Sequence, residues 1–361
     1  MSNEFGNNIK ISVFGQSHSE SIGAEVQGLP KGETFCYEKL CEFMQRRAPG
    51  RNRFSTARKE PDKVLFESGV KDGAITGETL RAVIKNTNVR SGDYDNTIDI
   101  PRPGHADYTA FVKYKGKNDM HGGGQFSGRL TAPVCAIGGI CLQLLEKRGI
   151  YVGAHAAEIH GILDDSFDEK TIGKELFESL AKKDFPVLNQ EKGLLMQDEI
   201  DKARKNLDSV GGVIECAVVG MPAGFGGPLF EGLEGQLAKG LFGIPAVKGV
   251  EFGAGFEASR MYGSENNDEF YMEQGRVRTR TNNHGGILGG ITSGMPLTLR
   301  VAIKPTPSIA RTQNSVSLKT MKNAELNIIG RHDPCIVQRA VPVVEAVTAI
   351  VLLDILLGGE E

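Results

Sequence analysis

The sequence predicts an α+β fold in which a few long apolar helices pack against antiparallel sheets. The first observation is a pair of long apolar helical runs, 131–148 and 341–357, the earlier of which is closed by Gly149. The second is that short strand-like segments lie between the helices without the regular spacing of strand–helix–strand units. Because each half of the chain ends in a long helix, a weak two-part symmetry is also expected.

The elements of the N-terminal half follow from side-chain periodicity. Residues 9–15 alternate into a short strand that ends at the polar turn GQSHSE. Residues 36–47 place Leu40 and Met44 at helical spacing, which predicts an amphipathic helix. Residues 63–85 are rich in strand-forming side chains and are divided by glycines, so we expect several short strands there.

Three further elements are predicted in the C-terminal half. Residues 196–207 carry charges throughout and predict an exposed helix. Residues 212–219 and 297–304 have the pattern of strands and are flanked by glycine turns. The apolar run 341–357 then closes the chain as a buried helix.

Length and composition restrict the class of protein. The chain has 361 residues, 40% of them hydrophobic, and no linker or low-complexity tract, so we expect a single domain over residues 1–361. The net charge of −3 argues against a nucleic-acid-binding protein, which would need a strongly basic domain. The six cysteines form no CxxC pair, which indicates reduced thiols and no metal site.

Two observations predict a cytoplasmic protein without a membrane segment. The N-terminal sequence MSNEFGNNIK lacks the apolar core of a signal peptide. The apolar run 341–357 contains Glu345 and Asp354 and is too short to span a bilayer comfortably.

Two polar loops in the first 60 residues are candidates for chemistry. His18 lies between Ser17 and Ser19 directly after a strand, where a histidine is a candidate acid or base, although a structural histidine is the commoner case. The run RRAPGRNR (46–53), followed by Arg58, contains five arginines within thirteen residues. Arginine suits bidentate binding of phosphate or carboxylate, with solvated surface charge as the alternative.

Two later regions repeat this combination of glycine, histidine and arginine. RPGHAD (102–107) is followed by HGGGQFSGR (121–129), which leads into the long helix and offers backbone N–H groups to an anion. It matches neither a Walker A loop nor a dinucleotide-binding fingerprint. NNHGGILGG (282–290), KPTPS (304–308) and RHDP (331–334) follow in the C-terminal third. Together these loops predict an enzyme that binds a phosphorylated, anionic small molecule.

These motifs, in this order, resemble those of the chorismate synthase family along essentially the full chain. The matching segments are GQSHS, RRAPGRNR, RPGHADYTAFVKY, the triple-glycine loop, NNHGGILGGITSG, KPTPS, and GRHDPC with the following RAVPVVEA. The resemblance implies an anti-1,4-elimination of phosphate from 5-enolpyruvylshikimate 3-phosphate, which gives chorismate. It also implies a need for reduced FMN without net redox change, NADPH as one source of reducing equivalents, a homotetramer, and a helical layer between antiparallel sheets.

The resemblance also assigns roles to individual residues. His18 would protonate the departing phosphate, and His105 would lie beside the flavin and protonate its reduced anionic form. Asp333 would assist proton removal through flavin nitrogen 5, with Ser17 and Ser127 as supporting hydrogen-bonding groups. The residues implied for the substrate are Arg47, Arg53, Arg102, Arg129 and Arg339. Those implied for the flavin are Gln125, Phe126, Ser127, Pro245, Ala246, Gly289, Lys304, Pro305, Thr306, Pro307, Ser308 and Arg331.

The chain departs from the family pattern at three places. Ser19 replaces the usual glycine, Gln125-Phe126-Ser127 replaces Arg-Ser-Ser, and Pro245 replaces asparagine. The last two lie in segments implied to contact the flavin. An alternative interpretation is therefore a weakened homologue that binds FMN or a phosphorylated ligand without turnover. A flavin reductase using NADPH is a third, disfavoured because no dinucleotide-binding fingerprint is present.

Overall fold

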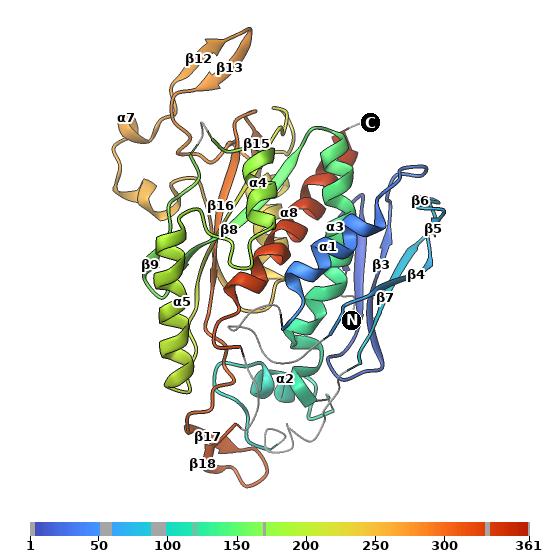
Figure 1. Cartoon of the computed structure of the whole chain (residues 1–361), viewed down its shortest axis with the longest axis vertical. Coiled ribbons are helices and arrows are strands. Elements are labelled where there is room, and N and C mark those ends of the chain that lie inside the picture. Colours follow the sequence, from blue (N-terminus) through green and yellow to red (C-terminus); the bar gives the residue numbers. More distant parts are fainter. Residues whose placement is uncertain are drawn as a thin grey trace.

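The computed structural model describes residues 4–50, 60–87, 99–117, 119, 121–168, 171–328 and 333–359. Two five-stranded sheets and a set of long helices make up most of this part of the chain (Figure 1). All strand pairs within the two sheets are antiparallel. The α+β class is therefore confirmed, whereas the two-part symmetry and the single-domain organisation stay predictions.

The first sheet has the strand order β1-β2-β3-β7-β4. Its strands are β1 (Glu4–Phe5), β2 (Lys10–Gly15), β3 (Ser21–Gln27), β4 (Val64–Ser68) and β7 (Leu80–Lys85). The expected β-rich stretch is confirmed, and it also contains the small pair β5 (Val70–Lys71) and β6 (Ala74–Ile75). Gly69, Gly73 and Gly77 all have positive φ at its turns.

The second sheet has the order β11-β16-β10-β8-β9. Its strands are β8 (Tyr151–Ile159), β9 (Ile162–Leu163), β10 (Gly212–Val219), β11 (Val247–Phe252) and β16 (Leu297–Ile303). The predictions for 212–219 and 297–304 are confirmed, the second to within one residue.

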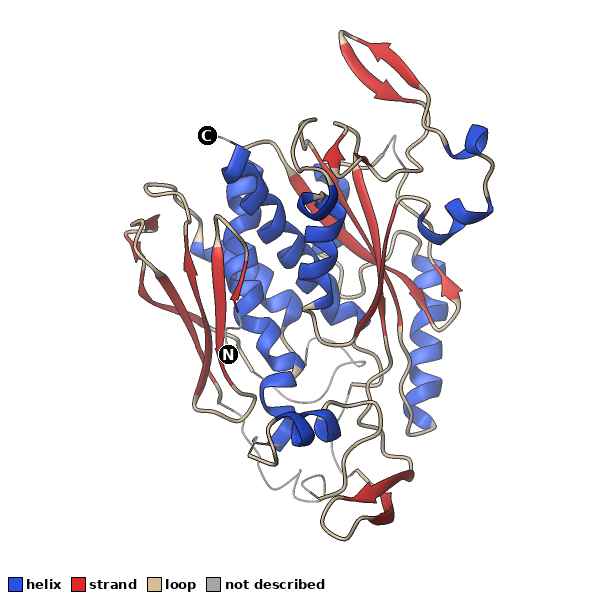
Figure 2. Cartoon of the chain, turned by 180° about the vertical axis from the view of Figure 1, so that it is seen from behind, coloured by secondary structure: helices blue, strands red, loops and turns tan. Residues whose placement is uncertain are grey.

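Long helices lie between the two sheets, as Figure 2 shows. They include α1 (Tyr37–Arg47), α3 (Thr131–Lys147), α6 (Leu233–Phe242) and α8 (Val337–Gly359). The helix predicted at 131–148 is confirmed, with Gly149 in the left-handed region at φ +76. Two helical segments, Gly128–Lys147 and Val337–Gly359, are long and apolar enough to cross a membrane, but 72% and 89% of their apolar windows are buried inside the fold. Such burial is typical of core helices.

The remaining elements surround this core. They are α2 (Asp107–Lys113), α4 (Lys174–Ala181), α5 (Gln190–Lys205), α7 (Gly263–Asn266), and the hairpins β12–β13 (Phe270–Glu273 and Arg276–Thr279), β14–β15 (Ile287–Leu288 and Ile291–Thr292) and β17–β18 (Gln313–Ser317 and Lys322–Leu326). The described residues also contain the short 3₁₀ segments η2 (His121–Phe126), η3 (Gly128–Leu130), η4 (Leu229–Glu231) and η5 (Gly255–Arg260).

Two sequence predictions were wrong in their extent. The helix expected at 341–357 spans Val337–Gly359, so it is long enough to cross a bilayer, although it is mostly buried inside the fold. The helix expected at 196–207 begins at Gln190, because the Asn189 side chain caps it by accepting hydrogen bonds from two backbone N–H groups. Met196 and Ile200 are fully buried, so one face of α5 packs against the protein although charges occur along its length.

Candidate active site

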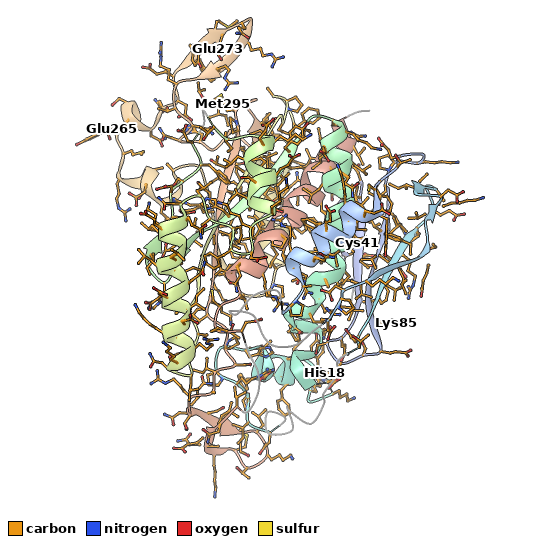
Figure 3. All side chains as sticks on the ribbon, in the orientation of Figure 1. His18, Cys41, Lys85, Glu265, Glu273 and Met295 are labelled. Carbon is orange, nitrogen blue, oxygen red and sulfur yellow. The ribbon has the colours of Figure 1, made fainter. Side chains whose placement is uncertain are left out.

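The polar loops gather at one end of the helical layer, around α2 and the first turn of α3 (Figure 1). Helix α1 ends at Arg47 because Pro49 favours an extended conformation at Ala48, which has ψ 146. Arg339, in the first turn of α8, donates from Nε to the Arg47 carbonyl oxygen at 3.1 Å. The start of α8 and the end of α1 therefore meet here, and Figure 3 draws His18 at the same end.

His18 lies in the turn after β2 and is held by its neighbour. Gly15 has φ +88, and a side chain there would meet the Ser21 carbonyl oxygen at 2.6 Å, so the turn requires glycine. The buried Ser17 places its Oγ 3.0 Å from His18 Nδ1. The Ser17 backbone N–H donates to the Gly124 carbonyl oxygen at 3.2 Å, which ties this turn to the triple-glycine loop.

Ser19 braces the same turn with its hydroxyl group. Its Oγ accepts from the Gln16 N–H at 2.9 Å and lies 2.8 and 2.7 Å from the carbonyl oxygens of Gln16 and Ser21. The side chain that replaces glycine therefore stabilises the turn and leaves the path of the backbone intact.

His105 is oriented by a buried carboxylate. Its Nδ1 lies 2.5 Å from Asp107 Oδ1, and Arg102 holds Asp107 by donating from Nε at 2.7 Å and from Nη2 at 2.8 Å. Ser308 Oγ accepts from Arg102 Nη1 at 3.3 Å. Burial alone would raise the pKa of Asp107, but hydrogen bonds from Arg102 and His105 and their charges hold it far below its ordinary value.

The second nitrogen of His105 faces the triple-glycine loop. A Cβ added at Gly123, which has φ +99, would lie 3.1 Å from His105 Nε2, so a larger residue there would crowd this nitrogen. Because the ionised Asp107 accepts a hydrogen bond from Nδ1, proton exchange is directed to Nε2. His105 thus has the arrangement of a positioned acid or base.

Arg47 and Arg129 share one carboxylate, that of Asp62. Arg47 Nη1 and Arg129 Nη1 both form ion pairs with Asp62, whose side chain is fully buried. Arg129 Nη2 also lies 2.5 Å from Glu60 Oε2. Arg47 Nε donates to Thr131 Oγ1 at 3.1 Å, which fixes it against the start of α3.

Asn86 connects this arginine pair to the histidine turn. Its Oδ1 accepts from Arg129 Nε at 3.0 Å, and its Nδ2 donates to the Ser19 carbonyl oxygen at 2.7 Å. The position directly after β7 makes this bridge possible, since β7 pairs with β3 beside the same turn.

Two further arginines are anchored on or near α8. Arg339 forms an ion pair with Asp333, which lies in the segment that precedes the helix. Arg46 donates to both carboxylate oxygens of the buried Glu345, at 2.6 and 2.8 Å. Burial lowers the pKa of Arg339 from its ordinary value, partly offset by Asp333.

The KPTPS segment borders His105 from the side of the second sheet. Lys304 donates from Nζ to the Gly104 carbonyl oxygen, and its backbone N–H donates to the Ala246 carbonyl oxygen at 3.0 Å. Burial, followed by the charge of Lys248, lowers the pKa of Lys304. Thr306 Oγ1 is buried and has no hydrogen-bond partner in the described part of the chain.

The structure therefore connects most of the predicted site residues through a continuous set of contacts. Gly289 is separate: it lies in the β14–β15 turn, and Figure 1 places β15 at the opposite end of the molecule from α2. Arg53 and Arg331 lie outside the described residues. Among residues with described positions, no group of three or more histidine, cysteine, aspartate or glutamate side chains could hold a metal ion.

Sequence reasoning missed the residues that orient the arginines, namely Glu60, Asp62 and Asn86. A signal for the two carboxylates was present, because Glu60-Pro61-Asp62 follows directly after five arginines in a chain of low net charge. Asp62 also has a positive φ of 46, which only the structure reveals.

An α+β protein with an oriented histidine beside a buried arginine–carboxylate cluster has the features of an enzyme for an anionic small molecule. The chain matches the chorismate synthase family over residues 9–357. A chorismate synthase of Korarchaeum cryptofilum is 43% identical over 97% of this chain and 96% of its own length. A chorismate synthase of Dehalococcoides mccartyi is 46% identical over 99% of this chain and 97% of its own length. A solved structure described as the crystal structure of chorismate synthase covers 98% of this chain and 93% of its own, with a TM-score of 0.72 and 26% identity. The chain belongs to the chorismate synthase family.

Proposed function

We propose that this chain is a lyase that eliminates phosphate from 5-enolpyruvylshikimate 3-phosphate to give chorismate. The observation that carries the proposal is the shared attachment of His18 and His105 to one loop. Ser17 bonds to Gly124, and His105 Nε2 faces Gly123. Two groups suited to proton transfer thus lie on either side of a glycine loop that adjoins the arginine cluster.

The substrate carries two carboxylates and a phosphate, which calls for several arginines. We assign Arg47, Arg129 and Arg339 to it, together with Arg53, which lies outside the described residues. Arg102 is bound to Asp107 through two guanidinium nitrogens, and this favours a role in positioning His105 alongside any contact with the substrate.

His18 is assigned as the acid for the departing phosphate. Ser17 Oγ bonds to Nδ1 and fixes the ring, so the proton available to a phosphate oxygen is the one on Nε2. We assign Asp333, in the segment before α8, to assisting the removal of the substrate proton, with Ser127 as a supporting hydrogen-bonding group.

The residues around His105 fit a flavin. Gly123 adds no side chain beside His105 Nε2, the buried Thr306 Oγ1 is a hydrogen-bonding group with no partner in the described part of the chain, and Lys304 is a cation. When bound, reduced FMN would supply electron density to the substrate as phosphate leaves. His105 would hold a proton at Nε2 beside it, and the holding segments would be 125–127, 245–246 and 304–308, with Arg331 outside the described residues.

A homotetramer in the cytoplasm completes the proposal. The hairpin β12–β13 extends away from the body of the protein and exposes Phe270, Met272 and Val277, which supports a contact with another copy (Figure 1). Gly289 lies far from the His105 loop within one chain, so its assignment to the flavin requires an approach from a neighbouring copy.

The test is an anaerobic assay of chorismate formation with reduced FMN and 5-enolpyruvylshikimate 3-phosphate. Chorismate formed at a rate that depends on the flavin supports the lyase. Ligand binding without chorismate would instead identify a weakened homologue, which the Gln125-Phe126 departure favours. Repeating the assay with oxidised FMN and NADPH decides whether the chain reduces its own flavin.

A further inference from the structure

Each arginine of the site whose position is described is paired with a carboxylate of the protein. The pairs are Arg46 with Glu345, Arg47 with Asp62, Arg102 with Asp107, Arg129 with Asp62 and Glu60, and Arg339 with Asp333. Within the described residues, five arginines therefore face five carboxylates, and the formal charge of these ten side chains is zero. A site that is to hold a substrate with a phosphate and two carboxylates would be expected to carry a clear positive excess.

Asp62 is the member of this set that lies between two arginines assigned to the substrate. Its Oδ2 pairs with Arg47 and its Oδ1 pairs with Arg129. The side chain has no exposed surface, and its backbone adopts a left-handed φ of 46, which aspartate tolerates better than most residues. Burial alone would raise the pKa of Asp62, but the charges of Arg47 and Arg129 outweigh burial and keep it below its ordinary value.

Neither arginine depends on Asp62 alone for its position. Arg47 also donates from Nε to Thr131 Oγ1 at 3.1 Å and from Nη2 toward the Gly128 carbonyl oxygen at 3.4 Å. Arg129 is also held by Asn86 and by Glu60. Asp62 therefore affects ligand binding more through its negative charge than through the orientation it gives to Arg47 and Arg129.

We propose that Asp62 is an internal counter-anion that sets the affinity of the arginine pair for anionic ligands. The inference rests on the proposed function, in which Arg47 and Arg129 contact the substrate. The reaction converts one anion into two, chorismate and phosphate, and both must leave. A negative charge shared by the two arginines weakens their hold on phosphate and carboxylate groups and so permits release of the products.

Asp62→Asn tests the charge with little change of shape. Asparagine keeps one carbonyl oxygen for an arginine and also tolerates left-handed φ. Inorganic phosphate is titrated into the purified full-length chain by calorimetry, and we expect its Kd to fall on the order of tenfold, equivalent to about 1.4 kcal/mol. In the elimination assay, inhibition by added phosphate should strengthen by a similar factor.

Two further variants keep the test decisive. Of the two arginines, Glu60→Gln removes a counter-charge from Arg129, so it should also tighten phosphate binding, and it serves if Asp62→Asn does not fold. Asp165→Asn changes the net charge equally at an exposed ion pair with Lys192, and phosphate binding should stay as in the unaltered chain. Unchanged or weaker phosphate binding in folded Asp62→Asn or Glu60→Gln would overturn the proposal that Asp62 is a counter-anion.

Arg47→Ala separates this inference from the proposed function. If it weakens the binding of phosphate and of substrate, the arginine pair is the binding site. With that result, the Asp62 series alone decides whether the counter-anion exists. If Arg47→Ala leaves the binding of both ligands unchanged, the placement of the substrate is wrong, and the inference falls with it.

Discussion

Replacing Asp107 with asparagine tests whether His105 works as an oriented acid or base. Asp107 accepts from His105 Nδ1 at 2.5 Å, from Arg102 Nε at 2.7 Å and from the Arg102 backbone N–H at 2.9 Å. Asparagine keeps the shape but loses the charge, and its amide can donate to Nδ1. The proton would then move to Nε2, and the nitrogen that faces Gly123 would be fixed as a donor.

The expected loss of turnover follows from the role of the His105 imidazole as an acid or base. Removing a positioned acid or base lowers turnover by roughly 10²–10⁴, so His105→Ala should fall in this range and Asp107→Asn should approach it. The KM of the substrate should change much less, because Asp107 contacts residues of the protein. Stability also falls, since breaking a buried ion pair and leaving Arg102 uncompensated costs about 3–5 kcal/mol.

The pH dependence of stability gives an independent check of the same carboxylate. The pKa of Asp107 is depressed in the folded chain, so its stabilisation is present above about pH 4 and is lost as the pH falls through the lower folded value. Asp107→Asn should therefore remove part of the decline in unfolding free energy below pH 4.

The assay is anaerobic chorismate formation with reduced FMN, run well below the melting temperature of each variant. The double variant His105→Ala/Asp107→Asn should be no slower than His105→Ala alone, because Asp107 acts through that ring. Wild-type turnover in a folded Asp107→Asn protein would refute this reasoning. Fully additive losses in the double variant would show that Asp107 acts elsewhere.

Two further predictions concern the core. Gly138→Ala would place a Cβ 2.3 Å from Ala346 Cβ, so overpacking between α3 and α8 should cost about 1–3 kcal/mol in denaturant unfolding. Gly235→Ala, in α6 with open space around it, should instead raise stability by about 0.5–1 kcal/mol, and equal effects would contradict the packing argument. His155 bonds to two buried carboxylates; burial alone would lower its pKa, but these partners raise it. Its stabilisation is therefore full below about pH 6.5 and lost as the pH rises through the raised value, so His155→Gln should flatten unfolding free energy against pH in that window.

The helices and the glycine loops were predictable from sequence because their signals are local. The apolar run before Gly149 and the break at Pro49 each fix a helix end within a few residues. The start of α5 at Gln190 was missed although its cause is local, because the capping Asn189 was not recognised as the beginning of the helix.

The arrangement inside the site depends on contacts between distant segments, and the sequence could not predict it. Asp62 meets Arg129 across 67 positions, and Arg129 meets Asn86 across 43. The periodicity of hydrophobic residues in a sequence does not predict contacts between side chains so far apart along the chain. Gly289 is the opposite case. Its sequence motif predicted a place in the active site, but the fold puts it at the other end of the chain from α2.

The described arginines of the site are paired with carboxylates, so other positive groups of the fold also contribute to the attraction of an anionic ligand. The long helices α3 and α8 both begin at this end, and their first turns add the positive ends of two helix dipoles. Arginines that are already held by carboxylates present their remaining donors in fixed directions. Such donors favour a ligand whose acidic oxygens match their spacing over a simple anion of equal charge, because little reorganisation is needed on binding. Selectivity for a molecule that carries both phosphate and carboxylate groups therefore follows from the same pairs that keep the net charge low.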